Sequence, residues 1–243
     1  MEQEERMESE ALKAYKQQEE KRMEINLRHL ENGVLFTDLR TAYIEESVKI
    51  GAGTRIGPCV TLRGNTAIGE NCIIGQNSRI EDCFIEDGVE IQSSVLLDSS
   101  VGKDTKIGPF AYLRPGSRVG KGCKVGDFVE MKNSSFGDGS KASHLTYIGD
   151  ADVGSGVNLG CGVVFVNYDG TNKYRSTVGD DAFIGCNSNL VSPVTVGAGA
   201  YIGAGSTVTE DVEADALYIA RSRGVTKQGW VSRKGILKKK EKK

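Results

Sequence analysis

The chain has 243 residues, of which 31 are glycine, 4 are proline and 7% are aromatic, a composition that argues against an ordinary layered globular core. Its net charge is −2, with both signs mixed along most of the chain, so no nucleic-acid-binding surface is predicted. It has no apolar run of about 18 residues and no apolar leader after Met1, so we expect a cytoplasmic protein without membrane segments.

The first predicted unit, residues 1–33, is a helix or linker. Its sequence is MEQEERMESEALKAYKQQEEKRMEINLRHLENG, which lacks proline, is rich in Glu, Lys, Gln and Ala, and ends at a glycine, as helices often do. We expect most of residues 4–31 to be helical. The expected role is a solvated cap on the end of the next unit or a linker, and the alternative is a coiled-coil assembly segment.

Residues 34–213 carry a six-residue repeat. From Ile44 the sequence divides into IEESVK IGAGTR IGPCVT LRGNTA IGENCI IGQNSR, and the same pattern resumes at Val101 and at Val178. The register slips by one residue near Ile85, Phe136 and Val153. An aliphatic residue at every sixth position fits neither a helix nor simple strand alternation, but it fits a solenoid in which three hexapeptides form one triangular coil.

This repeat resembles the left-handed parallel β-helix of the hexapeptide-repeat acyltransferases. The resemblance implies an all-β solenoid with an N-terminal α-helix and left-handed crossovers, and a right-handed β-helix is the alternative. A loop insertion, FVNYDGTNKYRST at residues 165–177, interrupts the repeat. Residues 214–243 are expected to form an irregular C-terminal arm, which carries Trp230 and ends in a basic, solvated tail.

Counting along the coils predicts which residues lie above one another. Arg114 and Lys132 are separated by one full coil of three hexapeptides in the same register, so they should stack on an outer edge about 4.8 Å apart, without a sequence neighbour to neutralise either. Like charges that stack in this way favour an anion between them, and arginine with lysine suits a phosphate. A solvated pair that splays apart is the alternative.

The slip at Phe136 makes one coil a single residue shorter than three hexapeptides, which places Glu130 under Tyr147 and Asp127 under His144. His144 then lies at a corner and not in the core.

The chain has only two histidines, and the other, His29, lies in the helical segment, so no metal site is predicted. The six cysteines at 59, 72, 83, 123, 161 and 186 form no CxxC pair and predict neither zinc nor disulfides. His144 therefore remains either a solvated corner residue or a group for proton transfer.

The motifs FVEMK, HLTY and NYDG resemble one family closely: the acetyltransferase domain of the bacterial bifunctional enzyme that makes UDP-N-acetylglucosamine. The resemblance extends from about Ile25 to Trp230. It implies acetyl transfer from acetyl-CoA to the amino group of glucosamine 1-phosphate, with His144 as general base and Glu130 and Asn167 as further catalytic groups. It also implies sugar-phosphate contacts from Arg114, Lys132, Tyr147, Asn158 and Lys173, and coenzyme contacts from Cys161, Asn167, Tyr168, Cys186, Ala204, Arg221 and Trp230.

The resemblance further implies a homotrimer with active sites between subunits. Cys161 and Cys186 depart from the pattern, since alanine and serine are frequent at these positions, which puts coenzyme affinity in doubt. The Gly-rich nucleotide-binding loop of the bifunctional enzymes does not occur in the 243 residues, so we predict neither uridyl transfer nor its magnesium requirement, and a separate uridyltransferase is a candidate partner that takes the product.

Two other functions remain open. One is a hexapeptide acyltransferase for a different amine acceptor, against which the Arg114 and Lys132 pair argues. The other is a non-catalytic subunit that serves in assembly, against which the retained histidine, lysine and arginine residues argue.

Overall fold

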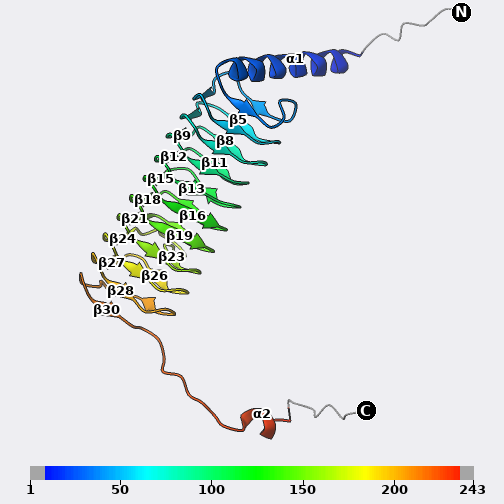
Figure 1. Ribbon diagram of the computed structural model, residues 1–243. Helices are drawn as coiled ribbons and strands as arrows, with labels where there is room; N and C mark the ends of the chain where they lie inside the picture. Colours follow the sequence, from blue (N-terminus) through cyan, green and yellow to red (C-terminus); the bar gives the residue numbers. More distant parts are fainter. Residues whose placement is uncertain (1–8, 236–243) are drawn as a thin grey trace, which may run out of the picture.

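The structure is a computed structural model that describes residues 9–235, and it begins with one long helix. Helix α1 (Glu10–Glu31) starts after Ser9, whose side chain accepts a hydrogen bond from the Leu12 amide. Its predicted start at residue 4 lies outside the described residues. The helix lies across the N-terminal end of the solenoid (Figure 1), where Asn26 is buried and donates to the carbonyls of Leu39 and Ala42. The N-terminal helix is thus confirmed, and it caps the first coil.

Three parallel sheets form the faces of a triangular solenoid, and each coil passes through sheet A, sheet B and sheet C in turn. Sheet A consists of β1 (Leu35–Phe36), β4 (Arg55–Ile56), β7 (Ile73–Ile74), β10 (Glu90–Ile91), β13 (Lys106–Ile107), β16 (Lys124–Asp127), β19 (Lys141–His144), β22 (Asn158–Leu159), β25 (Phe183–Ile184), β28 (Tyr201–Ile202) and β30 (Leu217–Tyr218). Sheet B consists of β2 (Tyr43–Ile44), β5 (Thr61–Arg63), β8 (Arg79–Glu81), β11 (Val95–Leu97), β14 (Tyr112–Leu113), β17 (Glu130–Lys132), β20 (Tyr147–Gly149), β23 (Val164–Val166), β26 (Asn189–Val191) and β29 (Thr207–Val208). Sheet C consists of β3 (Lys49–Ile50), β6 (Ala67–Ile68), β9 (Phe84–Ile85), β12 (Ser99–Val101), β15 (Ser117–Val119), β18 (Ser135–Phe136), β21 (Ala151–Val153), β24 (Ser176–Val178) and β27 (Thr195–Val196).

The hexapeptide pattern explains the core. The aliphatic first residue of each block points inward: Ile56, Leu62 and Ile74 are fully buried, and Ile50 in the first complete coil is partly buried. The small fifth residue is buried as well, and where it is polar it bonds to the backbone: the Thr54 and Thr105 hydroxyls donate to the carbonyls of Gly69 and Gly120. Because these positions recur every six residues, the core is one continuous column of side chains.

Coil length varies along the solenoid. Lys106 pairs with Lys124, one full coil of three hexapeptides later, whereas Lys124 pairs with Lys141, one residue short of a full coil, as the slip near Phe136 predicts. The structure adds two further five-residue steps, at Leu96 and Val101. The step at Leu96 is hidden in the sequence because this residue is followed by Leu97 and not by the marker glycine.

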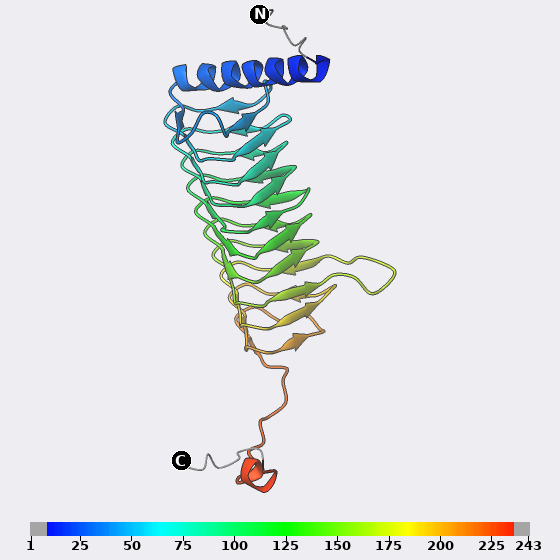
Figure 2. The same ribbon diagram turned by 90° about the vertical axis from the view of Figure 1, so that its right-hand side faces the viewer.

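The insertion and the C-terminal arm interrupt the regular coils. The insertion is shorter than the predicted range 165–177, because Phe165 is buried in β23 and Ser176 and Thr177 lie in β24. The chain leaves the solenoid between these strands as a long loop on one side (Figure 2), so Ala151 pairs with Ser176 and not with a residue one normal coil away. Beyond the predicted end of the repeats at Glu213, β30 adds a strand in which Tyr218 takes the inward position opposite Ile202. The arm then runs away from the coils to α2 (Trp230–Arg233) (Figure 1), and tail residues 236–243 lie outside the described residues.

All six cysteines are free thiols: Cys72, Cys83 and Cys123 are buried, Cys161 is half-buried, and Cys59 and Cys186 are exposed. Within residues 9–235, the structure contains no helix with the length and apolarity needed to cross a membrane.

Candidate functional site

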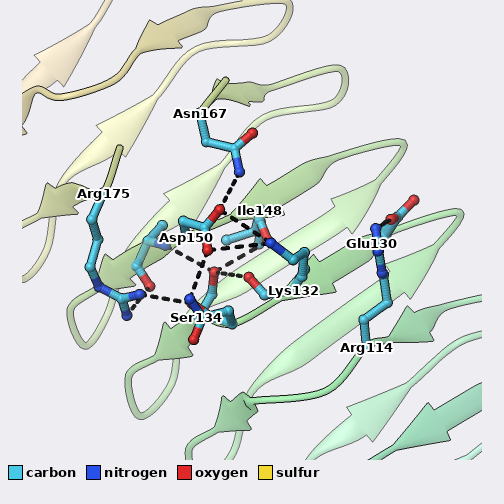
Figure 3. A network of polar contacts seen from close by, with 10 residues as sticks. Arg114, Glu130, Lys132, Ser134, Ile148, Asp150, Asn167 and Arg175 are labelled. Carbon is cyan, nitrogen blue, oxygen red and sulfur yellow. Dashed lines mark hydrogen bonds and ion pairs between the residues drawn. The ribbon is translucent and has the colours of Figure 1, made fainter. Parts of the chain in front are cut away.

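A group of charged and aromatic side chains lies on the outer face of sheet B. Glu130 at the start of β17 and Tyr147 at the start of β20 are directly paired, as predicted. Arg114 follows β14 one coil earlier, and its Nη1 donates to Glu130 Oε1 at 2.8 Å (Figure 3). This hydrogen bond is the main reason that the pKa of Arg114 is raised.

Gly149 leaves room for the Tyr147 ring. A Cβ at position 149 would lie 2.4 Å from the Tyr147 hydroxyl and 2.6 Å from the adjoining ring carbon. The phenol therefore lies over Gly149, along the strand and toward the corner at which sheet B turns into sheet C. We call this the B–C corner, and Arg114 and Lys132 lie at it too.

Asp150 joins three elements at the B–C corner. It is only 7% exposed, and its carboxylate lies 3.4 Å from Lys132 Nζ, 2.7 Å from Asn133 Nδ2 and 2.5 Å from Asn167 Nδ2 (Figure 3). Burial alone would raise the pKa of Asp150, but the hydrogen bonds from the two amides and the nearby ammonium outweigh it and lower that pKa. One buried carboxylate thus links coil to coil and the coils to the start of the insertion.

The stacked cations differ from the prediction in one respect: each has its own carboxylate. Arg114 pairs with Glu130, and Lys132 pairs with Asp150. Each cation has its partner on the next coil: Glu130 lies one coil after Arg114, and Asp150 lies one coil after Lys132. Arg114 still has guanidinium donors beyond the one that Glu130 accepts, and Lys132 is held only at 3.4 to 3.5 Å, so both can donate to a further ligand.

The end of the insertion is fixed by a second aspartate. Arg175 Nε and Nη2 both lie 2.5 Å from Asp152 oxygens, and Nη1 donates to the Asn133 carbonyl at 2.8 Å. The guanidinium beside Asp152 lowers the pKa of that carboxyl to about 2. Asp150 at the B–C corner and Asp152 in β21 therefore fasten the loop at its two ends.

His144 lies at the other edge of sheet B, where sheet A turns into sheet B. We call this the A–B corner. His144 ends β19, its side chain is 55% exposed, and its Nδ1 lies 2.5 Å from Asp127 Oδ1 at the end of β16. The predicted stack of these two residues is confirmed. The hydrogen bond to His144 is also the main cause that lowers the pKa of Asp127.

The A–B corner continues as a column toward the C-terminal end. The paired residues Ala142, Leu159, Ile184 and Ile202 set the register of four successive coils. Two residues beyond them lie His144, Cys161, Cys186 and Ala204, stacked in that order, and the Cys161 carbonyl accepts from the Asn187 amide at 2.8 Å. At about 4.8 Å per coil, Ala204 lies about 14 Å from His144. Arg221 lies beside the next coil, with its Cδ 3.8 Å from a Cβ built on Gly205.

An exposed apolar ridge lies at the A–B corner below and beside His144. The Phe110 and Phe128 rings stack with centroids 5.5 Å apart, and Leu145 occupies the same place one coil on. Each is more than half exposed, and each has a positive φ, which bulky residues rarely adopt. The corner thus presents large apolar side chains at turn positions where glycine or asparagine would be less strained.

The remaining predicted residues lie apart from these two corners. Asn158 projects from β22 in sheet A, Tyr168 and Lys173 pair by an isolated bridge in the insertion, and Trp230 begins α2 on the arm. One chain therefore unites Arg114, Glu130, Lys132, Tyr147 and Asn167 on and beside sheet B, and places His144 with Cys161, Cys186 and Ala204 at the A–B corner.

Sequence reasoning did not select Asn133, Asp150, Asp152 or Arg175. Counting one shortened coil onward from Asn133 leads to Asp150, so the stacking rule could have found that pair, but nothing in the sequence marks the Arg175 contact across the insertion. In the part of the chain that the structure describes, no three His, Cys, Asp or Glu side chains form a group suited to a metal ion.

Comparison with known proteins identifies the family. Residues 30–129 match the family described as EIF2B subunit epsilon LbH domain, and residues 175–210 match Bacterial transferase hexapeptide (six repeats). The chain is 60% identical over 218 residues to the bifunctional protein GlmU of Alkaliphilus oremlandii and 57% identical over 219 residues to that of Clostridioides difficile. Each match covers 90% of this chain and 48% of the relative, so the chain spans about half the length of the curated relatives it matches.

A solved structure of LpxA, a UDP-N-acetylglucosamine acyltransferase from Bacteroides fragilis, is 20% identical, covers 75% of this chain and 70% of that one, and has a TM-score of 0.46. The predicted left-handed parallel β-helix of hexapeptide repeats is confirmed. The chain belongs to the family of the hexapeptide-repeat acetyltransferase domain of the bacterial bifunctional GlmU proteins.

Proposed function

We propose that this chain transfers the acetyl group of acetyl-CoA to the 2-amino group of glucosamine 1-phosphate. The observation that carries the proposal is the column at the A–B corner, in which the expected base, His144, is followed coil by coil by Cys161, Cys186 and Ala204, the expected coenzyme positions. The similarity to the GlmU relatives supports the same assignment.

The acceptor would lie on the outer face of sheet B, at its B–C corner. Arg114 and Lys132 keep free donors at the B–C corner, which suits a phosphate, and Glu130 and Tyr147 offer hydrogen-bonding groups between that corner and His144. Lys173 and Asn158 would contact the acceptor from the insertion and from sheet A. The phosphate and the amine of glucosamine 1-phosphate are on neighbouring carbons, so an acceptor held at the B–C corner does not reach His144 at the opposite edge of the same sheet. The histidine that meets the amine would therefore belong to a neighbouring copy of the chain, in the homotrimer proposed below.

The chemistry needs one base and one oxyanion donor. His144 takes a proton from the acceptor amine as its nitrogen attacks the thioester carbonyl carbon. The carbon–sulfur bond then breaks, and the leaving thiolate of CoA receives the proton back from the imidazolium. The donors we assign to the developing oxyanion are the backbone amide of Cys161 beside His144 and the Asn167 side chain of the neighbouring copy that holds the phosphate. Acetylated sugar phosphate and free CoA are the products, without a covalent enzyme intermediate.

The coenzyme would follow the A–B corner column away from His144, past Cys161, Cys186 and Ala204 to Arg221. Tyr168 and Trp230 would complete its contacts from the insertion and the arm. We further propose a homotrimer, because the ridge of Phe110, Phe128 and Leu145 is apolar and exposed beside the column, and because the loop and the arm project from their own solenoid (Figure 2). That the chain transfers no uridyl group stays a prediction.

A thiol-release assay with acetyl-CoA and glucosamine 1-phosphate tests the proposal. The protein should release CoA only with the sugar phosphate, and His144→Ala should lower kcat by about 10²- to 10⁴-fold, the usual contribution of a positioned base. His29→Ala, which changes the other histidine at the far end of the solenoid, is the matched control. Activity on serine or another amino sugar alone would select the different-acceptor alternative, and no activity on any amine would favour a non-catalytic subunit.

A further inference from the structure

The strands that carry Asp127 and His144 are longer than the others. Among the described strands, β16 and β19 have four residues each, and the rest have two or three. The extra length continues their pairing to Asp127 opposite His144, at the point where other coils have already turned into the A–B corner. The two side chains thus meet because the ladder is extended there.

Gly126 permits this extension. A Cβ at position 126 would lie 2.0 Å from the Ser143 carbonyl oxygen and 2.7 Å from its carbon. These are backbone atoms and cannot move aside, so any larger residue would push β16 away from β19. The close approach of the two strands is therefore built into the sequence immediately before Asp127.

The contact defines the protonation of the imidazole. Asp127 is ionised at neutral pH, and an ionised carboxylate can only accept hydrogen bonds. Its Oδ1 lies 2.5 Å from His144 Nδ1, so Nδ1 must carry the proton. In the neutral ring the free lone pair is then on Nε2.

We infer that Asp127 is a positioning residue, which holds His144 with its proton on Nδ1 so that Nε2 accepts the proton of the acceptor amine. The catalytic part of this inference rests on the proposed function, whereas the protonated nitrogen is a property of the chain itself. A carboxylate in this position also stabilises the imidazolium that forms when the amine gives up its proton.

Nitrogen NMR measures the first part directly. With His29→Gln in the background, His144 is the single histidine of the full chain, so its two ring nitrogens are assigned without ambiguity. We expect a protonated Nδ1 and an unprotonated Nε2 in the neutral ring. With Asp127→Ala the proton should move to Nε2 in most molecules, the form that a free imidazole favours, whereas Asp127→Glu, which keeps a carboxylate at an exposed corner, should retain at least part of the Nδ1–H form.

Kinetics measure the second part. Asp127→Ala should lower kcat by about 10- to 100-fold, a share of what a positioned base contributes, with the KM for the acceptor within about twofold. Asp127→Glu should recover part of that loss. Asp104→Asn, which removes a negative charge from another exposed corner, should leave kcat unchanged and so controls for the loss of charge.

The outcomes separate the two proposals. The role of Asp127 is overturned if the neutral His144 ring of the parent protein carries its proton on Nε2. It is also overturned if Asp127→Ala changes neither the protonated nitrogen nor kcat. In both cases sugar-dependent CoA release still stands. If the parent protein releases no CoA, the proposed function fails, and the NMR comparison still decides whether Asp127 sets the imidazole form. The parent spectrum alone is decisive if Asp127→Ala does not fold.

Discussion

The Asp150 carboxylate lies 3.4 Å from the ammonium of Lys132, and both groups are largely withdrawn from solvent. The same carboxylate accepts a 2.5 Å hydrogen bond from Asn167 at the start of the insertion. Asp150 therefore holds both Lys132, which we assign to the acceptor phosphate, and Asn167, which we assign to the oxyanion. We do not expect Asp150 itself to contact the acceptor or the coenzyme.

Asp150→Asn should weaken both stability and acceptor binding. The substitution keeps a residue that tolerates the positive φ of this turn but removes the charge that Lys132 and the two amides share. We expect the free energy of unfolding to fall by about 2 kcal/mol, less than for a fully buried pair because Lys132 is 21% exposed, and the KM for glucosamine 1-phosphate to rise. Denaturant unfolding and initial-rate kinetics measure the two effects.

Asp215→Asn is the matched control, since Asp215 also has a positive φ but is exposed near the end of the solenoid. Equal effects of the two substitutions would show that Asp150 has no special part in the site.

Gly149→Ala should displace the Tyr147 ring without unfolding the protein. The new methyl group meets the end of a side chain, which can swing away, and position 149 has no positive φ. We expect kcat/KM for the acceptor to fall about tenfold, equivalent to about 1.4 kcal/mol, with little change in the thermal midpoint. Gly224→Ala, on the arm with open space around it, is the control, and an unchanged kcat/KM in Gly149→Ala would remove Tyr147 from the acceptor site.

The Arg175 and Asp152 pair should hold the insertion closed at neutral pH. Arg175→Ala frees the end of the loop, so chymotrypsin should cleave after Tyr168 and Tyr174 several-fold faster, as followed by mass spectrometry. Arg79→Ala, at a distant exposed ion pair, should leave the cleavage rate unchanged. Equal cleavage rates in the parent and in Arg175→Ala would mean that the contact does not restrain the loop.

The same pair gives a defined pH dependence. The folded pKa of Asp152, about 2, lies below its unfolded value of about 3.9, so its stabilisation is complete above about pH 5 and is lost as the pH falls toward 2. The difference in thermal midpoint between the parent and Asp152→Asn should therefore be constant from neutral pH to about pH 5 and should shrink below it. A difference that grows on acidification would contradict the assignment.

Thiol labelling tests whether acetyl-CoA binds along the column at the A–B corner. Cys59 and Cys186 are exposed and should react first, Cys161 more slowly, and Cys72, Cys83 and Cys123 only on unfolding, since burial also raises the pKa of Cys83 to about 11. Acetyl-CoA should protect Cys186 and Cys161 and leave Cys59, which lies many coils away, as the internal control. Protection of Cys59 alone, or of none, would move the coenzyme off this corner.

Much of the fold was predictable because the repeat records the inward positions directly. The aliphatic marker and its glycine give the register wherever both occur, which is why the Asp127–His144 and Glu130–Tyr147 stacks follow from counting. At Leu96, which is followed by Leu97, and at Tyr218 in β30, the aliphatic–glycine signal is incomplete and counting does not give the register. The strands form there nevertheless, because pairing with the neighbouring coil holds them in place.

The site was predictable by position but not by partner. The sequence places Arg114 above Lys132, yet it does not show that Glu130 and Asp150 project toward them, because side-chain direction at a corner depends on the slip of the neighbouring coil. The contact of Arg175 with Asp152 was beyond sequence reasoning for another reason: the length of a loop does not tell where its far end returns.

The place of β16 and β19 in the stack has a further consequence. They are the sixth and seventh of the eleven strands of sheet A, and each coil rests only on its two neighbours. Thermal opening in such an array begins at its ends, where a coil has one neighbouring coil and not two. The residues that hold the imidazole therefore lie where backbone amides should exchange with solvent most slowly, and shortening the array from either end should cost stability long before it disturbs the histidine.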